Sequence, residues 1–328
     1  MSTQTGLNVK ANTIDVTAIG LDFLWLEITP RCNLNCVHCY AESDMSRALH
    51  GKLQLEDWNG LLTEASQLGC RKCQFIGGEP TLHPDLPKMI SEAHKLGFEM
   101  IEVYTNGTHF TDKLKQCFKE NGVCLAFSVY AADAATHDSI TGHKRSFDRT
   151  ISALRWAVEA GLQVRVGVVE MEQNKGQFQQ TRARLEKEGV KQIKLDRIRG
   201  IGRGARSVSV ESQIGELCGN CWRGSVCVCA DGSVYPCVFS RFRPIGEFNQ
   251  GLATIIKGND LASFRTELFA GNPIAAQSAK SVAEGVDPCD PMCGPCNPTC
   301  NPADCSPATS PPNPPNCGPD HTCGPNTN

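Results

Sequence analysis

The segment Phe23-Leu-Trp-Leu-Glu-Ile-Thr29, followed by Pro30-Arg31-Cys32-Asn-Leu-Asn-Cys36-Val-His-Cys39-Tyr40, places a short apolar run directly before three closely spaced cysteines. The apolar run has the length and composition of a buried strand. The loop that follows has the spacing C-x3-C-x2-C. A [4Fe–4S] cluster usually takes four cysteines, so three would leave one iron open to another ligand. Short cysteine spacings also bind zinc, which is the alternative for this loop on its own.

The composition of the chain fits a cytoplasmic enzyme. Its 328 residues include 32 basic and 35 acidic ones, and the net charge of −3 gives no footprint for nucleic acid. No signal peptide is evident, and no segment reaches the roughly 20 apolar residues of a membrane span. Nineteen cysteines, an odd number, are better explained by metal clusters than by disulfides in a reducing compartment.

Apolar runs of strand length alternate with amphipathic stretches of helix length in the N-terminal part of the chain. Strands are expected at residues 23–29, 72–76, 99–104, 123–129, 163–169 and 192–198, and helices at 54–68, 84–96, 112–120, 147–160 and 176–188. This alternation indicates parallel strands. The prediction is an α/β fold, a partial (β/α)6 barrel similar to a TIM barrel, with its site at the C-terminal ends of the strands.

Polar motifs follow several of the expected strands. Gly77-Gly78-Glu79-Pro80 follows the second strand, Thr105-Asn106-Gly107 the third, and Ser128 ends the fourth. Glycine permits close approach of a ligand, and a carboxylate can accept hydrogen bonds from an ammonium group. Each motif alone could be an ordinary turn. Their position after successive strands favours one shared site.

The order of these motifs resembles the radical S-adenosylmethionine (SAM) superfamily, in which a C-x3-C-x2-C loop is followed by a GGEP motif after the next strand. The resemblance implies a [4Fe–4S] cluster on Cys32, Cys36 and Cys39, with SAM chelating its open iron. It also implies reductive cleavage of SAM to a 5′-deoxyadenosyl radical that takes a hydrogen atom from the substrate. The implied SAM site comprises Tyr40, Gly77, Gly78, Glu79, Pro80, Thr105, Asn106 and Ser128, with Glu79 as the partner of the SAM ammonium group.

Two further stretches are similar to parts of related maturases. The segment after Ser128 resembles SLDG-x4-H-D-x-I-x-G, except that Tyr130 replaces the usual aspartate, which implies a different substrate or substrate pose. The exit of the sixth strand resembles a G-x-G-R segment that packs near adenine in relatives. Asp196 and Arg199 are therefore candidate contacts to SAM or substrate, and a surface ion pair is the alternative.

The C-terminal part of the chain is rich in cysteine. Asp231-Gly232 within alternating apolar residues predicts a hairpin with Cys227 and Cys237 on its two arms. The cysteine pattern resembles a SPASM domain, also called twitch-like in its shorter form, which binds up to two auxiliary [4Fe–4S] clusters. The resemblance implies Cys221, Cys227, Cys237 and Cys305 for one cluster and Cys293, Cys296, Cys300 and Cys317 for the other.

Alternatives to these ligand sets remain. Cys218, Cys229 and Cys289 compete for the same places, and one auxiliary cluster with an open or shortened second site is also possible. Four other cysteines fall within expected helices and strands, where free cysteine behaves as a small buried hydrophobe: Cys70, Cys73, Cys117 and Cys124.

The expected organisation has four parts. These are an extension at 1–20, the radical SAM partial barrel at 21–205, an auxiliary iron–sulfur domain at 206–305 and a tail at 306–328. The last forty residues are too rich in proline to form helices or interior strands. We expect residues 289–305 to wrap a cluster and the tail to be flexible.

The resemblance favours modification of a ribosomally made peptide as the function. A separate leader-binding protein could assist, and an electron donor of flavodoxin or ferredoxin type is implied. Only about twenty residues precede the first strand, which leaves no room for a leader-binding domain there and keeps a second enzyme hypothesis open. That alternative is epimerisation, dehydrogenation or decarboxylation of a sugar or nucleoside in natural-product biosynthesis. An alternative from another class is a multi-cluster electron carrier or a zinc-binding scaffold, neither of which needs a SAM pocket.

Overall fold

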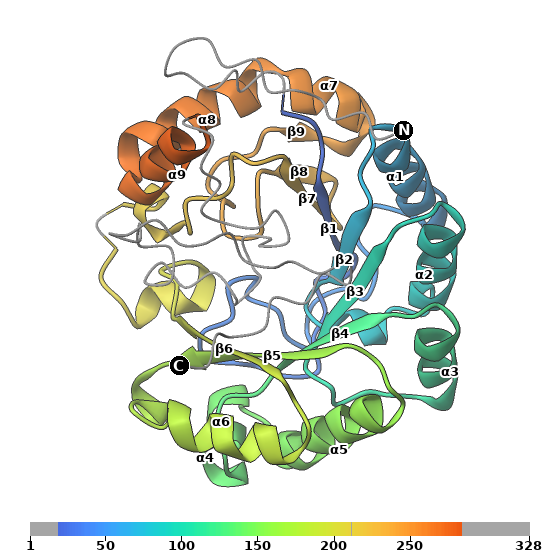
Figure 1. Cartoon of the computed structure of the whole chain (residues 1–328), viewed down its shortest axis with the longest axis vertical. Coiled ribbons are helices and arrows are strands. Elements are labelled where there is room, and N and C mark those ends of the chain that lie inside the picture. The colour runs from blue at the N-terminus through green and yellow to red at the C-terminus, as the bar shows by residue number, and fades with distance from the viewer. Residues whose placement is uncertain (1–18, 211, 284–328) are drawn as a thin grey trace, which may run out of the picture.

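A computed structural model describes residues 19–210 and 212–283 of the chain (Figure 1). Within these ranges one sheet has the strand order β6-β5-β4-β3-β2-β1-β7-β8-β9. Its first six strands in sequence are parallel: β1 (Phe23–Glu27), β2 (Lys72–Ile76), β3 (Met100–Thr105), β4 (Cys124–Ser128), β5 (Val164–Glu170) and β6 (Gln192–Arg197). The predicted mixed α/β fold with a parallel, partial-barrel sheet is confirmed.

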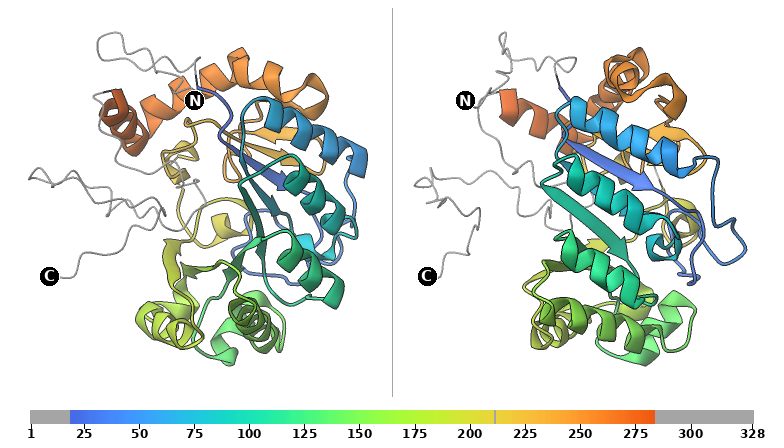
Figure 2. Two further views of the ribbon diagram at one scale, coloured as in Figure 1. Left: turned by 45° about the vertical axis from the view of Figure 1, so that its right-hand side comes forward. Right: turned by 90° about the vertical axis from the view of Figure 1, so that its right-hand side faces the viewer.

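Helices cover the outer side of the curved sheet (Figures 1 and 2). The expected ones are α1 (Leu55–Gln67), α2 (Leu86–Lys95), α3 (Asp112–Glu120), α5 (Ser146–Glu159) and α6 (Phe178–Lys187). Short 3-10 turns lie at Pro80–Leu82, Glu172–Asn174, Gly202–Arg206, Ile214–Glu216 and Phe248–Gln250. Every strand and helix expected in this part of the chain is present, and each begins and ends within two residues of its predicted boundaries.

Helix α4 (Ala134–Thr141) was not expected, because its eight residues show little amphipathic pattern. Local chemistry explains it instead. The Asp133 side chain accepts a hydrogen bond from the backbone N–H of Thr136 and caps the start. Gly142 ends the helix in the left-handed conformation, with φ of 69°.

The chain returns to β1 after β6 and extends the same sheet. Strand β7 (Ser225–Cys229) pairs in parallel with β1, and β8 (Ser233–Tyr235) and β9 (Gly246–Glu247) follow in antiparallel pairing. The hairpin predicted around Asp231-Gly232 is therefore present between β7 and β8. Helices α7 (Leu252–Lys257), α8 (Asn259–Gly271) and α9 (Pro273–Ala283), which the sequence analysis did not anticipate, lie at this end of the sheet (Figure 1).

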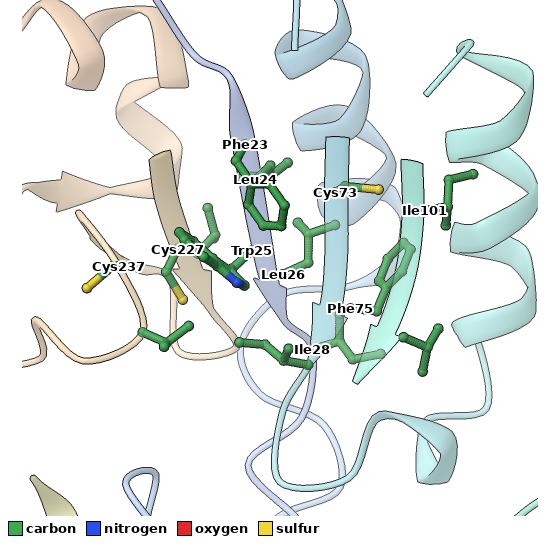
Figure 3. Packing of buried hydrophobic residues seen from close by; sticks show 14 of the residues in the cluster. Phe23, Leu24, Trp25, Leu26, Ile28, Cys73, Phe75, Ile101, Cys227 and Cys237 are labelled. Atoms are coloured by element: carbon green, nitrogen blue, oxygen red, sulfur yellow. The ribbon is translucent and has the colours of Figure 1, made fainter. Parts of the chain in front are cut away.

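Strand β1 is the centre of the hydrophobic core. All five of its residues are buried, and β2 and β7 pair with its two edges (Figure 3). Cys70, Cys73 and Cys117 lie in the same core, where they pack as small apolar side chains, and Cys124 is half-buried. No described helix is long and apolar enough to cross a membrane.

A buried ion pair links two strands inside the barrel. Arg165 of β5 donates from Nε and Nη2 to the two carboxylate oxygens of Glu102 on β3, at 2.7 and 2.6 Å. Gln74 of β2 donates to the same carboxylate. The guanidinium also lies 5.3 Å from the centre of the Tyr104 ring. A buried charge pair of this kind depends on both partners, because one charge left alone cannot be solvated.

We expect Arg165→Met to lower the free energy of unfolding by about 3–5 kcal/mol, because Glu102 would be left as an uncompensated buried charge. Urea denaturation followed by tryptophan fluorescence measures the change. The double variant Arg165→Met/Glu102→Gln should recover part of the loss. Arg182→Met is the matched control, because the pair of Arg182 with Glu186 is exposed on both partners and should cost about 1 kcal/mol or less. An equal loss in both single variants would contradict this reasoning.

Candidate active site

One pocket gathers most of the predicted site residues at the C-terminal ends of the strands. Its lining includes Cys32, Cys36, Cys39, Tyr40, Gly77, Gly78, Glu79, Thr105, Asn106, Ser128, Asp196 and Arg199. Pro80 is not part of this lining. It begins the 3-10 turn behind Glu79 and is buried.

The three cysteines of the loop share this pocket. Burial raises the pKa of the Cys32 thiol to about 12, with a further contribution from the Glu79 carboxylate. Burial, and then the neighbouring Cys39 and Cys32, raise the pKa of Cys36 well above its ordinary value. The Cys32 and Cys36 thiols therefore stay protonated at neutral pH unless a metal takes the place of the protons.

Gly77 and Gly78 are required by the close approach of two backbone segments. A Cβ atom at Gly77 would lie 2.5 Å from the Thr29 carbonyl oxygen, and one at Gly78 would lie 2.2 Å from that of Arg31. The N–H groups of Gly78 and Glu79 donate to these same two oxygens at 2.7 and 2.8 Å. The observed reason for the glycines is thus contact with the chain that leads into Cys32, rather than positive φ angles.

Glu79 joins two of the motifs. Its fully buried carboxylate accepts hydrogen bonds from the Thr81 N–H, from the hydroxyls of Thr81 and Thr105, and from the Asn106 N–H. Burial raises the pKa of Glu79, while these hydrogen bonds oppose the rise. Three of the bonds end on one carboxylate oxygen and one on the other, so the second oxygen has the greater capacity for another donor.

Asn106 connects the turn after β3 to the cysteine loop. Its side-chain amide donates to Asn33 Oδ1 at 2.9 Å and approaches Cys32 Sγ at 3.7 Å. Its own Oδ1 accepts from the N–H and hydroxyl of Thr108. Asn106 is therefore held on both sides in contact with Cys32 of the cysteine loop.

Arg203, which the sequence analysis did not single out, follows β6 in the chain and forms hydrogen bonds with the cysteine loop. Its backbone N–H donates to the Cys39 carbonyl at 3.0 Å, its Nε to that of Cys36 at 2.8 Å, and its Nη2 to that of Ser43 at 2.9 Å. Gly202 beside it has φ of +57° and lies so close that a Cβ would be 2.3 Å from the Tyr40 carbonyl oxygen. In the sequence, only the resemblance of residues 200–203 to the G-x-G-R segment of relatives pointed to Arg203.

Helix α4 braces the same loop from another direction. The N–H groups of Asn35 and Val37 donate to the carbonyls of Thr141 and Ile140, at 3.0 and 3.1 Å. Tyr130, which replaces the aspartate of the motif that this segment resembles, packs its ring edge-on against His38 with centroids 4.8 Å apart. The departure from the family pattern thus places an aromatic ring against the cysteine loop.

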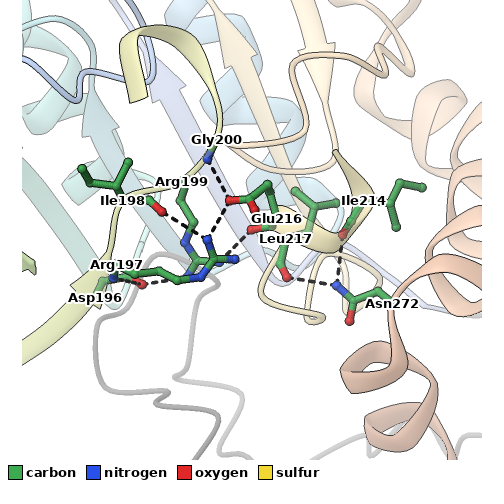
Figure 4. A network of polar contacts seen from close by, with 9 residues as sticks. All are labelled: Asp196, Arg197, Ile198, Arg199, Gly200, Ile214, Glu216, Leu217 and Asn272. Carbon is green, nitrogen blue, oxygen red and sulfur yellow. Dashed lines mark hydrogen bonds and ion pairs between the residues drawn. The ribbon is translucent and has the colours of Figure 1, made fainter. Parts of the chain in front are cut away.

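The exit of β6 is fixed by a polar network around Glu216 (Figure 4). Arg199 donates to Asp196 and to the Glu216 carbonyl, and the Glu216 carboxylate accepts from Arg197 and from the Gly200 N–H. Asp196 and Arg199 thus form the ion pair considered from the sequence, and both also line the pocket.

The C-terminal cysteines that the structure describes form two neighbouring groups. Cys221 and Cys237, expected to share a cluster, have their sulfur atoms 3.1 Å apart, and the Cys218 side chain interacts with Cys221. Cys227 interacts instead with Cys229 and Glu27. The other expected ligands, Cys293, Cys296, Cys300, Cys305 and Cys317, and their competitor Cys289, lie outside the described residues.

Comparison with known proteins identifies the barrel. Residues 26–185 match the sequence model of the radical SAM superfamily. These residues are a radical SAM domain. The crystal structure of Streptococcus suis SuiB bound to its precursor peptide SuiA superposes with a TM-score of 0.64 at 13% identity, covering 75% of this chain and 67% of that one. At this identity the likeness concerns the fold.

Curated relatives match over part of their length. Fe-coproporphyrin III synthase of Methanosarcina barkeri is 29% identical over 189 residues, which are 58% of this chain and 47% of the relative. The antilisterial bacteriocin subtilosin biosynthesis protein AlbA of Bacillus subtilis is 28% identical over 180 residues. These residues are 54% of this chain and 40% of the relative. The chain therefore spans less than half the length of these two relatives.

The residues of the radical SAM domain fit a [4Fe–4S] cluster and SAM. Three soft thiol ligands face one pocket, and no fourth cysteine lies among the described residues that line it. Two buried polar atoms of the lining, His38 Nδ1 and Ser43 Oγ, have no hydrogen-bond partner among the residues that the structure describes. A bound polar molecule would satisfy such atoms.

We expect Arg203→Gln to weaken retention of the loop cluster by at least about tenfold. The variant loses charged hydrogen bonds to two loop carbonyls, each worth about 1.5–3 kcal/mol. Iron remaining after challenge with a chelator measures the effect. Arg206→Gln is the matched control, because Arg206 lies in the same 3-10 turn, is exposed and makes only a 3.8 Å ion pair with Glu42. Equal retention by both variants would contradict the bracing role of Arg203.

Proposed function

We propose that the chain is a radical SAM enzyme that cleaves SAM reductively and removes a hydrogen atom from a ribosomally made peptide. The observation that carries this proposal is the convergence of the three-cysteine loop, the GGEP turn and the TNG turn on one pocket. An electron carrier or a zinc-binding scaffold would not need the GGEP and TNG turns to lie in the same pocket as the cysteine loop.

The proposed roles follow from the positions of the side chains. Cys32, Cys36 and Cys39 hold the cluster, and SAM lies against Tyr40, the 77–80 turn, Thr105, Asn106, Ser128, Asp196 and Arg199. Glu79 receives the SAM ammonium on the carboxylate oxygen that has fewer partners. When bound, the cluster and SAM supply the electron and the radical that takes the substrate hydrogen. The protein orients the substrate and keeps water from the pocket.

A peptide substrate is supported by the relatives whose names concern peptides, namely a bacteriocin biosynthesis protein and a structure with a bound precursor peptide. We propose that a flavodoxin or ferredoxin supplies the electron and that a separate protein can present the peptide leader. An auxiliary iron–sulfur cluster is proposed on Cys221 and Cys237, because both cysteines are buried and their side chains lie next to each other.

We expect Cys36→Ala to abolish formation of 5′-deoxyadenosine from SAM under dithionite, while iron at the C-terminal cysteines remains. The reason is that a cluster loop with two thiolates cannot hold its iron in place. Liquid chromatography of the products and iron analysis measure both effects. Cys73→Ala is the matched control, because Cys73 is buried in the core and distant from the chemistry. SAM cleavage retained in Cys36→Ala would overturn the proposed active site.

The peptide assignment is tested separately. Co-expression of the chain with short peptides encoded beside its gene should change the mass of one of them, and Cys36→Ala should leave that mass unchanged. SAM cleavage without any change of peptide mass would instead favour a small-molecule substrate.

A further inference from the structure

A second group of metal-ligand side chains lies where β1 meets β7. Strand β7 carries Cys227 and Cys229, and the parallel register pairs Glu27 of β1 with Cys229. Residues two apart on a strand, and residues paired across neighbouring strands, project from the same face of a sheet. One carboxylate oxygen and two sulfur atoms therefore come together, all within 4.8 Å of one another and all on buried residues.

The donor set suits a particular metal. Zinc binds cysteine sulfur at about 2.3 Å and carboxylate oxygen at about 2.0–2.2 Å, commonly with four ligands. Ligand atoms already within 4.8 Å need only small side-chain movements to reach those distances. The three ligands found among the described residues leave a fourth position, which water can take, and two thiolates favour zinc over magnesium or calcium.

Arg241 completes the balance of charge around these three residues. Its guanidinium forms an ion pair with Glu27 and lies 5.1 Å from the centre of the Tyr40 ring. Two thiolates and one carboxylate carry three negative charges, which a divalent ion and one guanidinium neutralise. A buried site needs such compensation, because uncompensated charge cannot be solvated there.

We propose that Glu27, Cys227 and Cys229 bind one Zn²⁺ ion, at a site separate from the cysteine loop and from the group of Cys218, Cys221 and Cys237. Binding releases the two thiol protons to solvent and changes no oxidation state. The ion fixes β7 to β1. Through the Glu27–Arg241 ion pair it also supports Tyr40, the residue that follows the last cysteine of the loop.

Zinc K-edge X-ray absorption of the full chain with its iron–sulfur clusters reconstituted, after dialysis against zinc-free buffer, tests the proposal. The expected result is one zinc per chain with two sulfur ligands and the remainder oxygen. Absence of zinc, or a shell of four sulfur atoms, would overturn the assignment. Because this measurement uses the unaltered protein, it tests for the zinc ion even if a variant fails to fold.

Variants locate the ion. Cys229→Ser should lower the sulfur count to one or remove the zinc, and Glu27→Gln, similar in shape, should weaken zinc binding by at least about tenfold. Cys73→Ser, in the core of the adjacent β2, is the matched control and should leave zinc unchanged. The pair Cys221→Ser/Cys237→Ser should also leave it unchanged. If Cys229→Ser removes iron in place of zinc, the two thiols belong to an iron–sulfur cluster and the proposal is wrong.

Discussion

The conformation of the cysteine loop depends on backbone hydrogen bonds that reach it from three parts of the fold. The turn after β2 donates to the carbonyls that precede Cys32, α4 accepts from N–H groups inside the loop, and Arg203 donates to the carbonyls of Cys36 and Cys39. A loop of this length has no regular structure of its own, so its geometry must come from these partners. The barrel supplies them because its strand ends meet at one edge.

The same constraint explains which features the sequence could predict. Strand and helix positions follow from local hydrophobic period, and the motifs after β2 and β3 stand next to those strands in the chain. Their meeting in one pocket then follows from parallel topology alone. Arg203 is different, because it lies 167 residues from the Cys36 carbonyl that it contacts. A long-range hydrogen bond has no local pattern, and only the G-x-G-R resemblance pointed to that segment.

Helix α4 and strand β7 show two other limits of sequence reasoning. The α4 sequence has almost no amphipathic period, although His137, Ile140 and Thr141 are buried, so the caps at Asp133 and Gly142 are the clearest local signals of this helix. For β7 the hairpin with β8 was predictable from Asp231-Gly232, but its parallel pairing with β1 was not. Pairing partners distant in sequence are selected by the packing of the whole core, and β1 gains a second buried edge from β7.

That pairing also determines the chemistry near β1. Because the register sets Cys229 against Glu27, a strand residue that precedes the cysteine loop becomes part of a second group of ligands. Arg241 contacts both Glu27 of this group and the Tyr40 ring, so it connects the group to the residue that follows the cysteine loop. A shift of β7 by one residue would turn Cys227 and Cys229 to the opposite face. It would leave Glu27 with Arg241 alone, and no thiol would remain beside the pair. The strand register thus controls which metal ligands this part of the chain can assemble.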